Sequence, residues 1–148
     1  MKKIFFLLTI TLITTTKLFS QRVIAVETNS ITSLYSSVDS ALNHANNGST
    51  IYLPGGAFNI GNLTISKGVK IIGAGHYPDS SAVTGITQLN GNISFVTGSD
   101  NASLQGIYVN GDIRLGTSSG NQTVNSIEIR RCNINSLNLS FDGSTSTS

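Results

Sequence analysis

The chain has 148 residues, of which 39% are hydrophobic and only 11% charged, with 15 glycines and 2 prolines. This length suits one domain, and the recurrent Ile, Leu, Val and Phe exclude wholesale disorder. The single cysteine, Cys132, excludes an internal disulfide, and we expect its thiol to be buried. Abundant Asn, Ser, Thr and Gly with little charge favour β structure in a secreted protein.

The N-terminal segment has the order of a secretory signal peptide. Lys2 and Lys3 precede an apolar run over residues 4–13, and a Thr-rich stretch then leads to the small residue Ser20. The apolar run has about ten residues, whereas a bilayer-spanning helix needs about twenty, so a membrane span is the less favoured alternative. We therefore expect residues 1–21 to be a signal peptide, and the protein to be secreted or held in a bacterial cell envelope.

Export changes the charge of the chain. Of the nine basic residues, three lie in residues 1–21, which leaves six against seven acidic residues and a net charge near minus one. Nucleic-acid binding depends on accumulated Lys and Arg, so we do not expect nucleic acid as a partner.

One helix is expected over residues 33–47, after a short strand at 23–26. Ser36 with Asp39 resembles a capping box, Ser33 is the alternative cap, and Gly48 is placed to end the helix. The apolar side chains recur with the 3.6-residue period of a helix, at Leu34, Val38, Ala41, Leu42 and Ala45.

From residue 49 onward, short apolar alternations separated by Gly, Asn, Asp and Ser predict strands. They are centred on residues 51–53, 58–60, 63–65, 69–71, 93–95, 107–109, 113–115, 127–129 and 137–139. Segments this short and regular favour a coil in which each turn stacks on the turn before it, rather than an antiparallel sandwich.

The later strands repeat with an almost constant period. Residues 104–109 align with 129–134 at a shift of 25, and residues 113–115 align with 137–139 at a shift of 24. In a coil of this period, residues one period apart lie directly over one another. The expected interior positions are Leu104, Ile107, Val109, Ile129, Cys132 and Ile134.

Two longer stretches carry a family resemblance. Residues 37–58, SVDSALNHANNGSTIYLPGGAF, and residues 63–75, LTISKGVKIIGAG, resemble the N-terminal part of right-handed parallel β-helix proteins of the pectate lyase superfamily. The resemblance implies an all-β solenoid of about three coils over residues 22–140, with the helix at 33–47 as its N-terminal cap. It implies little about function, because the superfamily includes lyases, hydrolases, epimerases and non-catalytic surface proteins.

The Ser/Thr-rich tail, residues 141–148, predicts no helix or strand, so the last coil is expected to be uncapped. Enzymes of the superfamily generally have more coils than the number expected here. We therefore expect either a fragment of a longer protein, or self-association of the chain through this C-terminal end.

The acidic residues are not arranged as lyase or hydrolase chemistry requires. Uronate lyases group carboxylates around calcium and use Arg or Lys as the base, and hydrolases hold two carboxylates at a fixed separation. In the expected coil Asp112 lies over Ser136 and Glu128 over Ser103, so these acids form no pair. No catalytic residue, metal ligand or cofactor is assigned; calcium is expected only if the protein is a lyase.

Two expected stacks of outward side chains are candidates for contact with a polysaccharide. One stack contains Arg114 and Asn138 beside Ser94, and the other contains Lys70, Tyr108 and Asn133. A cation and an aromatic ring beside amides can bind a carboxylated sugar, and an ordinary solvated sheet face is the alternative. The substrate-binding candidates are therefore Arg114, Lys70, Tyr108, Asn133 and Asn138.

A further candidate is the interruption at residues 74–85. It contains His76, Tyr77 and Asp79, and it could line a cleft or be a surface loop.

Two classes of function remain. The sequence fits best a secreted or surface-exposed β-helix module that associates with glycan and is non-catalytic. The alternative is the N-terminal fragment of a polysaccharide lyase or glycoside hydrolase whose catalytic coils are missing.

Overall fold

The computed structural model describes residues 22–77, 85–116 and 124–139. The predicted signal peptide, the tail at 141–148, and Asp79 of the 74–85 interruption lie outside the described residues. Within the described part of the chain, no helix is long and apolar enough to cross a membrane.

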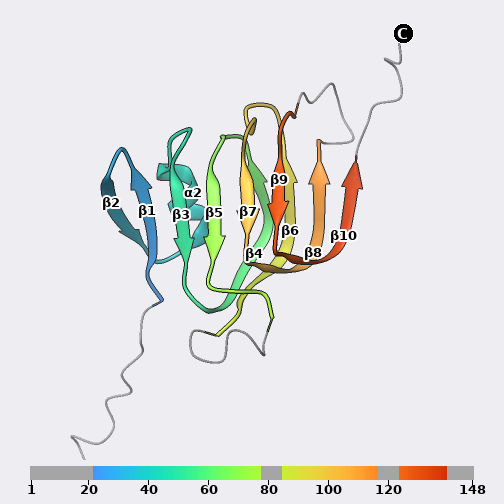
Figure 1. Ribbon diagram of the computed structural model, residues 1–148, viewed down its shortest axis with the longest axis horizontal. Helices are drawn as coiled ribbons and strands as arrows, with labels where there is room; N and C mark the ends of the chain where they lie inside the picture. The colour runs from blue at the N-terminus through green and yellow to red at the C-terminus, as the bar shows by residue number, and fades with distance from the viewer. Residues whose placement is uncertain (1–21, 78–84, 117–123, 140–148) are drawn as a thin grey trace, which may run out of the picture.

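Ten strands and one short helix form the described structure (Figure 1). They are β1 (Ile24–Thr28), β2 (Ile31–Tyr35), α2 (Val38–His44), β3 (Thr50–Leu53), β4 (Gly56–Ile65), β5 (Lys70–Gly73), β6 (Thr87–Phe95), β7 (Ser103–Gln105), β8 (Tyr108–Leu115), β9 (Glu128–Arg130) and β10 (Asn133–Leu139). The strands form a six-stranded sheet, in the order β2-β1-β3-β5-β7-β9, and a four-stranded sheet, in the order β10-β8-β6-β4.

From β3 onward, successive strands alternate between the two sheets. Each strand pairs in parallel with the strand two places further along the chain, so β3, β5, β7 and β9 stack in one sheet and β4, β6, β8 and β10 in the other. Among the described strands, the antiparallel pairs are β1 with β2 and β1 with β3. The described residues are mostly strands in parallel sheets, with one short helix, so the predicted strand-rich fold is confirmed.

The observed register confirms the period read from the sequence. Leu104 pairs with Ile129, and Val109 pairs with Ile134, as the shift of 25 predicts. Apolar side chains from both sheets fill the space between them, since parallel stacking places like residues over like. Leu104, Ile107 and Val109 are fully buried, whereas their partners one period later are only partly buried.

Cys132 shows where the prediction of complete burial is wrong. Its side chain is half-buried and packs against the core. It lies in the last described coil, where no described strand covers the next position. Burial still raises the pKa of its thiol, so the thiolate is disfavoured.

The predicted helix at 33–47 is also wrong at its N-terminal end. Residues 31–35 form β2, and the helix begins only at Val38 with Ser37 as its N-cap, whose hydroxyl accepts from the Ser40 amide at 3.2 Å. Asn29 and Ser30 have positive φ and turn the chain into an antiparallel hairpin, so pairing with β1 outweighs the helical spacing of Leu34. Leu34 is consequently 67% exposed instead of buried.

The C-terminal end of α2 is held by Lys67, which lies between β4 and β5. Ala45 is the C-cap, so Gly48 does not end the helix, although its φ is positive. Lys67 Nζ donates to the carbonyl oxygens of Leu42, Asn43 and Ala45 at 3.1, 2.8 and 2.8 Å. A cation at this position satisfies carbonyls that the helix leaves unpaired, and it also suits the helix dipole. The helix contacts β1 and β4, at the end of the stack opposite β10 (Figure 1).

Replacing Lys67 with methionine is expected to lower the free energy of unfolding by about 2 kcal/mol, because hydrogen bonds from a charged donor are lost. Methionine keeps the apolar stem and removes the donor. Thermal melts of Lys67→Met and of the unaltered chain measure the effect. Lys70→Met is the control: Lys70 is exposed and should tolerate the change. Equal melting temperatures for Lys67→Met and the unaltered chain would show that water replaces the lysine without cost.

Candidate functional site

The outward side of the four-stranded sheet is an array of polar side chains, here called the polar face. Residues of β4, β6, β8 and β10 that alternate with buried positions point outward and line up in rows across the strands. The rows are Ala57–Gln88–Tyr108–Asn133, Asn59–Asn90–Asn110–Asn135, Asn62–Asn92–Asp112–Ser136 and Thr64–Ser94–Arg114–Asn138.

One row is a ladder of asparagine amides. Asn90 donates to Asn59 at 3.2 Å, Asn110 donates to Asn90 at 3.2 Å, and Asn135 donates to Asn110 at 3.3 Å. Gln88 also donates to Asn90 Oδ1 at 2.6 Å. Each amide is therefore held in a fixed orientation by the strand beside it.

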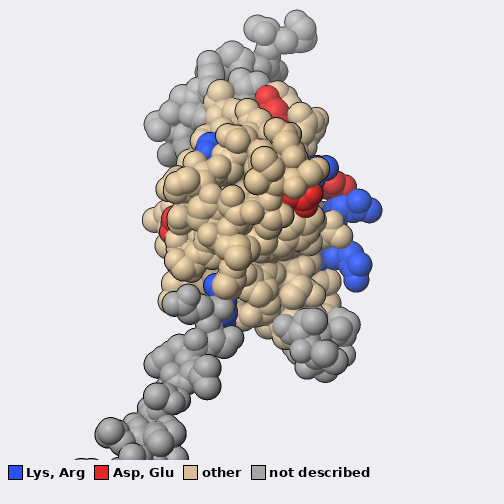
Figure 2. Space-filling view, turned by 90° about the vertical axis from the view of Figure 1, so that its left-hand side faces the viewer, with Lys and Arg blue, Asp and Glu red and all other residues tan. Residues whose placement is uncertain are grey.

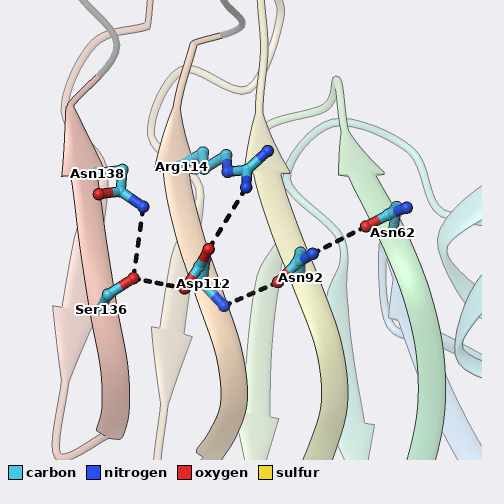
Figure 3. Close-up of polar contacts among 6 residues, drawn as sticks. All are labelled: Asn62, Asn92, Asp112, Arg114, Ser136 and Asn138. Atoms are coloured by element: carbon cyan, nitrogen blue, oxygen red, sulfur yellow. Dashed lines mark hydrogen bonds and ion pairs between the residues drawn. The ribbon is translucent and has the colours of Figure 1, made fainter.

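The neighbouring row is a mixed polar ladder, which Figure 3 shows. Asn92 Nδ2 donates to Asn62 Oδ1 at 3.0 Å, and Asn92 Oδ1 accepts from the backbone amide of Asp112 at 2.9 Å. Ser136 Oγ donates to Asp112 Oδ1 at 2.6 Å. This ladder joins all four strands of the sheet through side-chain bonds and one bond to the backbone amide of Asp112.

Both carboxylate oxygens of Asp112 are engaged. Arg114 donates to Oδ2 at 3.4 Å, while Ser136 donates to Oδ1 (Figure 3). The Ser136 hydroxyl and, to a smaller extent, the Arg114 guanidinium hold the pKa of Asp112 below its usual range, against the opposing effect of desolvation. Asp112 is therefore an ionised acceptor rather than a proton donor at neutral pH.

The predicted stack of Arg114 with Ser94 and Asn138 is confirmed by the strand register. Arg114 and Asn138 are exposed, and the Arg114 side chain retains 48% of its accessible surface. Asn138 Nδ2 donates to Ser136 Oγ at 3.4 Å, which links the outer row to the mixed ladder.

The second predicted stack is only partly right. Tyr108 and Asn133 are neighbours, as predicted. Lys70 is not with them: it lies in β5 of the six-stranded sheet, where Thr50 and Ser103 are its neighbours. The apolar-polar-apolar pattern of 69–71 resembles that of 107–109, but each coil contributes one such strand to each sheet. A three-residue pattern does not distinguish the two sheets.

The asparagine ladder was not predicted from the sequence. Its members are separated by 31, 20 and 25 residues, because the coils differ in loop length and in bulges. The signal that could have revealed it is the recurrence of asparagine just before or after a buried aliphatic residue in each long strand.

Two other polar side chains have local structural partners. Glu128 lies beside Ser103, as predicted, and forms an ion pair with Arg130 at 3.4 Å. His44 stacks on Tyr35 with ring centroids 5.2 Å apart. Among the described residues, no three His, Cys, Asp or Glu side chains are close enough together to hold a metal ion.

Charge is sparse on the face of the molecule that Figure 2 shows. Figure 2 views the molecule from the β2 side and shows mostly uncharged side chains, with several basic and acidic groups together at one margin. The described residues include six Lys and Arg, of which Arg114 lies in the rows of the polar face.

Comparison of the chain with protein-family models, with curated proteins and with solved structures gave no match. The resemblance to the pectate lyase superfamily stays a prediction from the sequence.

Proposed function

We propose that this chain is an exported, right-handed parallel β-helix module of the pectate lyase type that binds an acidic polysaccharide through its polar face without cleaving it. Support for the coil comes from strands that alternate between two sheets and pair in parallel with the coil before. Support for export comes from the order of residues 1–21.

The polar face is the observation that carries the binding proposal. An amide has two donors and two acceptor lone pairs, and the ladder bonds use only part of this capacity. The remaining groups can bond the hydroxyls of a sugar. Neighbouring strands are about 4.8 Å apart, so the sheet presents these groups at regular intervals to an extended chain.

Two side chains give the face a preference for acidic sugars. Arg114 contacts Asp112 through Nη2 alone, at 3.4 Å. Its other guanidinium donors can form a charge-assisted pair with a uronate carboxylate. Tyr108 is half-buried and presents a ring and hydroxyl beside Asn133. Rings of this kind combine an apolar surface with a polar group, which suits the faces and hydroxyls of a sugar.

Asp112 supports a binding role over a hydrolytic one. Glycoside hydrolysis needs a carboxylic acid that holds a proton near neutral pH, together with a second carboxylate at a set distance. The Asp112 carboxylate has its pKa lowered and both its oxygens bonded within the sheet. Its position favours a structural role in the mixed ladder.

The test is binding of polygalacturonate oligomers to the purified chain, measured by calorimetry with and without calcium. Arg114→Ala and Tyr108→Phe are expected to weaken binding, by about tenfold or more for the arginine because a charge-assisted pair is lost. Lys70→Ala is the matched control, since Lys70 is an exposed cation of the other sheet, and it should leave binding unchanged.

Equal binding by Arg114→Ala and the unaltered chain would contradict the polar face as the site. Release of unsaturated uronate or of shortened oligomers would contradict the non-catalytic proposal and favour the enzyme-fragment alternative.

A further inference from the structure

The last described coil leaves two strand edges open. β9 ends the six-stranded sheet on the side away from β2, and its outer edge has no partner strand within the described residues (Figure 1). β10 likewise ends the four-stranded sheet. We call these two edges the terminal edge, together with the partly buried or exposed apolar side chains of the same coil, Ile129, Cys132, Ile134, Leu137 and Leu139.

The hydrogen bonds of β9 show which of its main-chain groups face outward. The Glu128 amide donates to the Ala102 carbonyl at 3.0 Å, and the Arg130 carbonyl accepts from the Gly106 amide at 3.2 Å, so both residues bond to the β7 side. Main-chain groups of successive residues in a strand point to opposite edges. The amide and carbonyl of Ile129 therefore point to the outer edge, where a further strand can pair with them.

The side chains of β9 carry opposite charges on either side of Ile129. Glu128 and Arg130 lie on the outward side of the six-stranded sheet, and their ion pair at 3.4 Å leaves both side chains more than half exposed. When two copies of β9 pair in antiparallel fashion about Ile129, Glu128 of each copy is directly opposite Arg130 of the other. The charge pattern of β9 is thus complementary to that of a second copy.

The main chain selects the same register. With the two copies of Ile129 opposite each other, the amide of each donates to the carbonyl of the other, as in a hydrogen-bonded antiparallel pair. Glu128 and Arg130 of the other copy then form the next pair, which is not hydrogen-bonded and holds its Cα atoms about 4.5 Å apart. Opposite charges at directly opposite positions stabilise strand pairing. The direction of the main-chain groups and the charge pattern therefore agree on one register.

The other end of the stack fits β9 less well. The edge strand there, β2, has the sequence ITSLY, so it offers no charged side chain to Glu128 or Arg130. On the four-stranded sheet, α2 contacts the terminal strand β4. A head-to-tail contact between copies would leave both charges of β9 without an opposite charge. A two-fold contact uses the same edge of both copies and closes at two.

We propose that the terminal edge is the interface of a two-fold symmetric dimer, in which β9 pairs in antiparallel fashion with β9 of a second copy about Ile129. Glu128 and Arg130 set the register, and the contact covers apolar side chains of the terminal edge. The six-stranded sheets of the two copies then form one continuous sheet. This assembly does not depend on the proposed binding of polysaccharide.

The test reverses the charges of β9 one at a time. Glu128→Arg makes both charged positions of β9 positive and Arg130→Glu makes both negative, so each variant opposes like charges across the interface. Each should raise the dimer dissociation constant about tenfold or more, measured by sedimentation equilibrium. Lys70→Glu is the matched control for Arg130→Glu. Lys70 is an exposed cation of the same sheet, but it lies on β5 away from the edge, so the dissociation constant should not change.

Mixing the two variants separates the register from folding. Glu128→Arg paired with Arg130→Glu has opposite charges at both facing positions, so an equimolar mixture of the two weakly associating chains should form a heterodimer. The double variant that carries both changes should also recover the dimer, because both signs are reversed together. A variant that failed to fold would not be rescued in either way, and circular dichroism of each chain checks its folding.

Unchanged dissociation constants in both single variants would overturn the role of β9. Absence of a heterodimer on mixing would overturn the antiparallel register. A mass that keeps growing beyond that of a dimer would overturn the two-fold contact in favour of head-to-tail stacking, and a monomer at every concentration of the unaltered chain would overturn the interface itself.

Discussion

Replacing Gly91 with alanine is expected to destabilise the chain by about 3 kcal/mol or more, which is a large fraction of the total stability of a domain of this size. Gly91 has φ +134°, and a Cβ there would collide with the backbone of Gly61 in the strand below. Gly111 repeats the arrangement, since its Cβ would collide with the carbonyl oxygen of Gly91. These glycines let the long strands β4, β6 and β8 stack closely where they bend. Circular dichroism and thermal melts of Gly91→Ala measure the effect.

Gly61→Ala is the matched control. Gly61 pairs with Gly91 in the sheet and has φ +57°, but a Cβ there meets nothing within 4 Å. It should cost only the strain of a left-handed residue, roughly 1–2 kcal/mol. If the two variants lose equal stability, backbone strain alone explains the glycines and the close stacking does not.

The chain is expected to self-associate through the end of the stack formed by β9 and β10. Leu137 and Leu139 are 46% and 53% exposed, and Ile134 and Cys132 are only partly buried. The outer edges of β9 and β10 have no partner strand within the described residues. An unpaired edge beside apolar side chains favours addition of a strand from a second copy. Light scattering on the purified chain should therefore show a mass above that of a monomer, rising with concentration.

Leu137→Lys combined with Leu139→Lys is expected to shift the chain to a monomer, because charged side chains at an edge oppose pairing. Leu34→Lys is the control, since Leu34 is more exposed than either of these leucines but lies on β2 at the opposite edge of the six-stranded sheet. A monomer in the unaltered chain, or dissociation by Leu34→Lys alone, would contradict association through β9 and β10.

The register of the last two coils could be predicted from the sequence because parallel stacking demands repetition. Ile113 and Leu137 pair as the shift of 24 requires, and so do Asp112 and Ser136. The period there is regular, and each buried position must match the position below it to avoid a cavity. The same shift of 24 therefore also predicts the stacked polar pairs, such as Arg114 with Asn138.

The remaining features could not be predicted, because they depend on contacts distant in sequence. The hairpin β1–β2 overrides a helical spacing that Leu34 shares with Val38 by coincidence. Lys70 was assigned to the wrong sheet because successive strands alternate between the two sheets, and a three-residue pattern does not show which sheet a strand joins. The asparagine ladder depends on loops of unequal length, which remove any fixed spacing between Asn59, Asn90 and Asn110.

The parallel pairing of β3 through β10 makes the molecule close to a one-dimensional system. Each strand from β5 to β8 pairs with one strand before it and one after it, so we expect its stability to depend mainly on these two neighbours. The first coil is reinforced by α2 and Lys67, whereas the last described coil has a neighbour on one side only. We therefore expect local opening to start at β9 and β10 and to proceed toward β3 and β4. The polar face spans all four strands of its sheet, so a polysaccharide bound across it would join a labile end to a stable one and resist this opening.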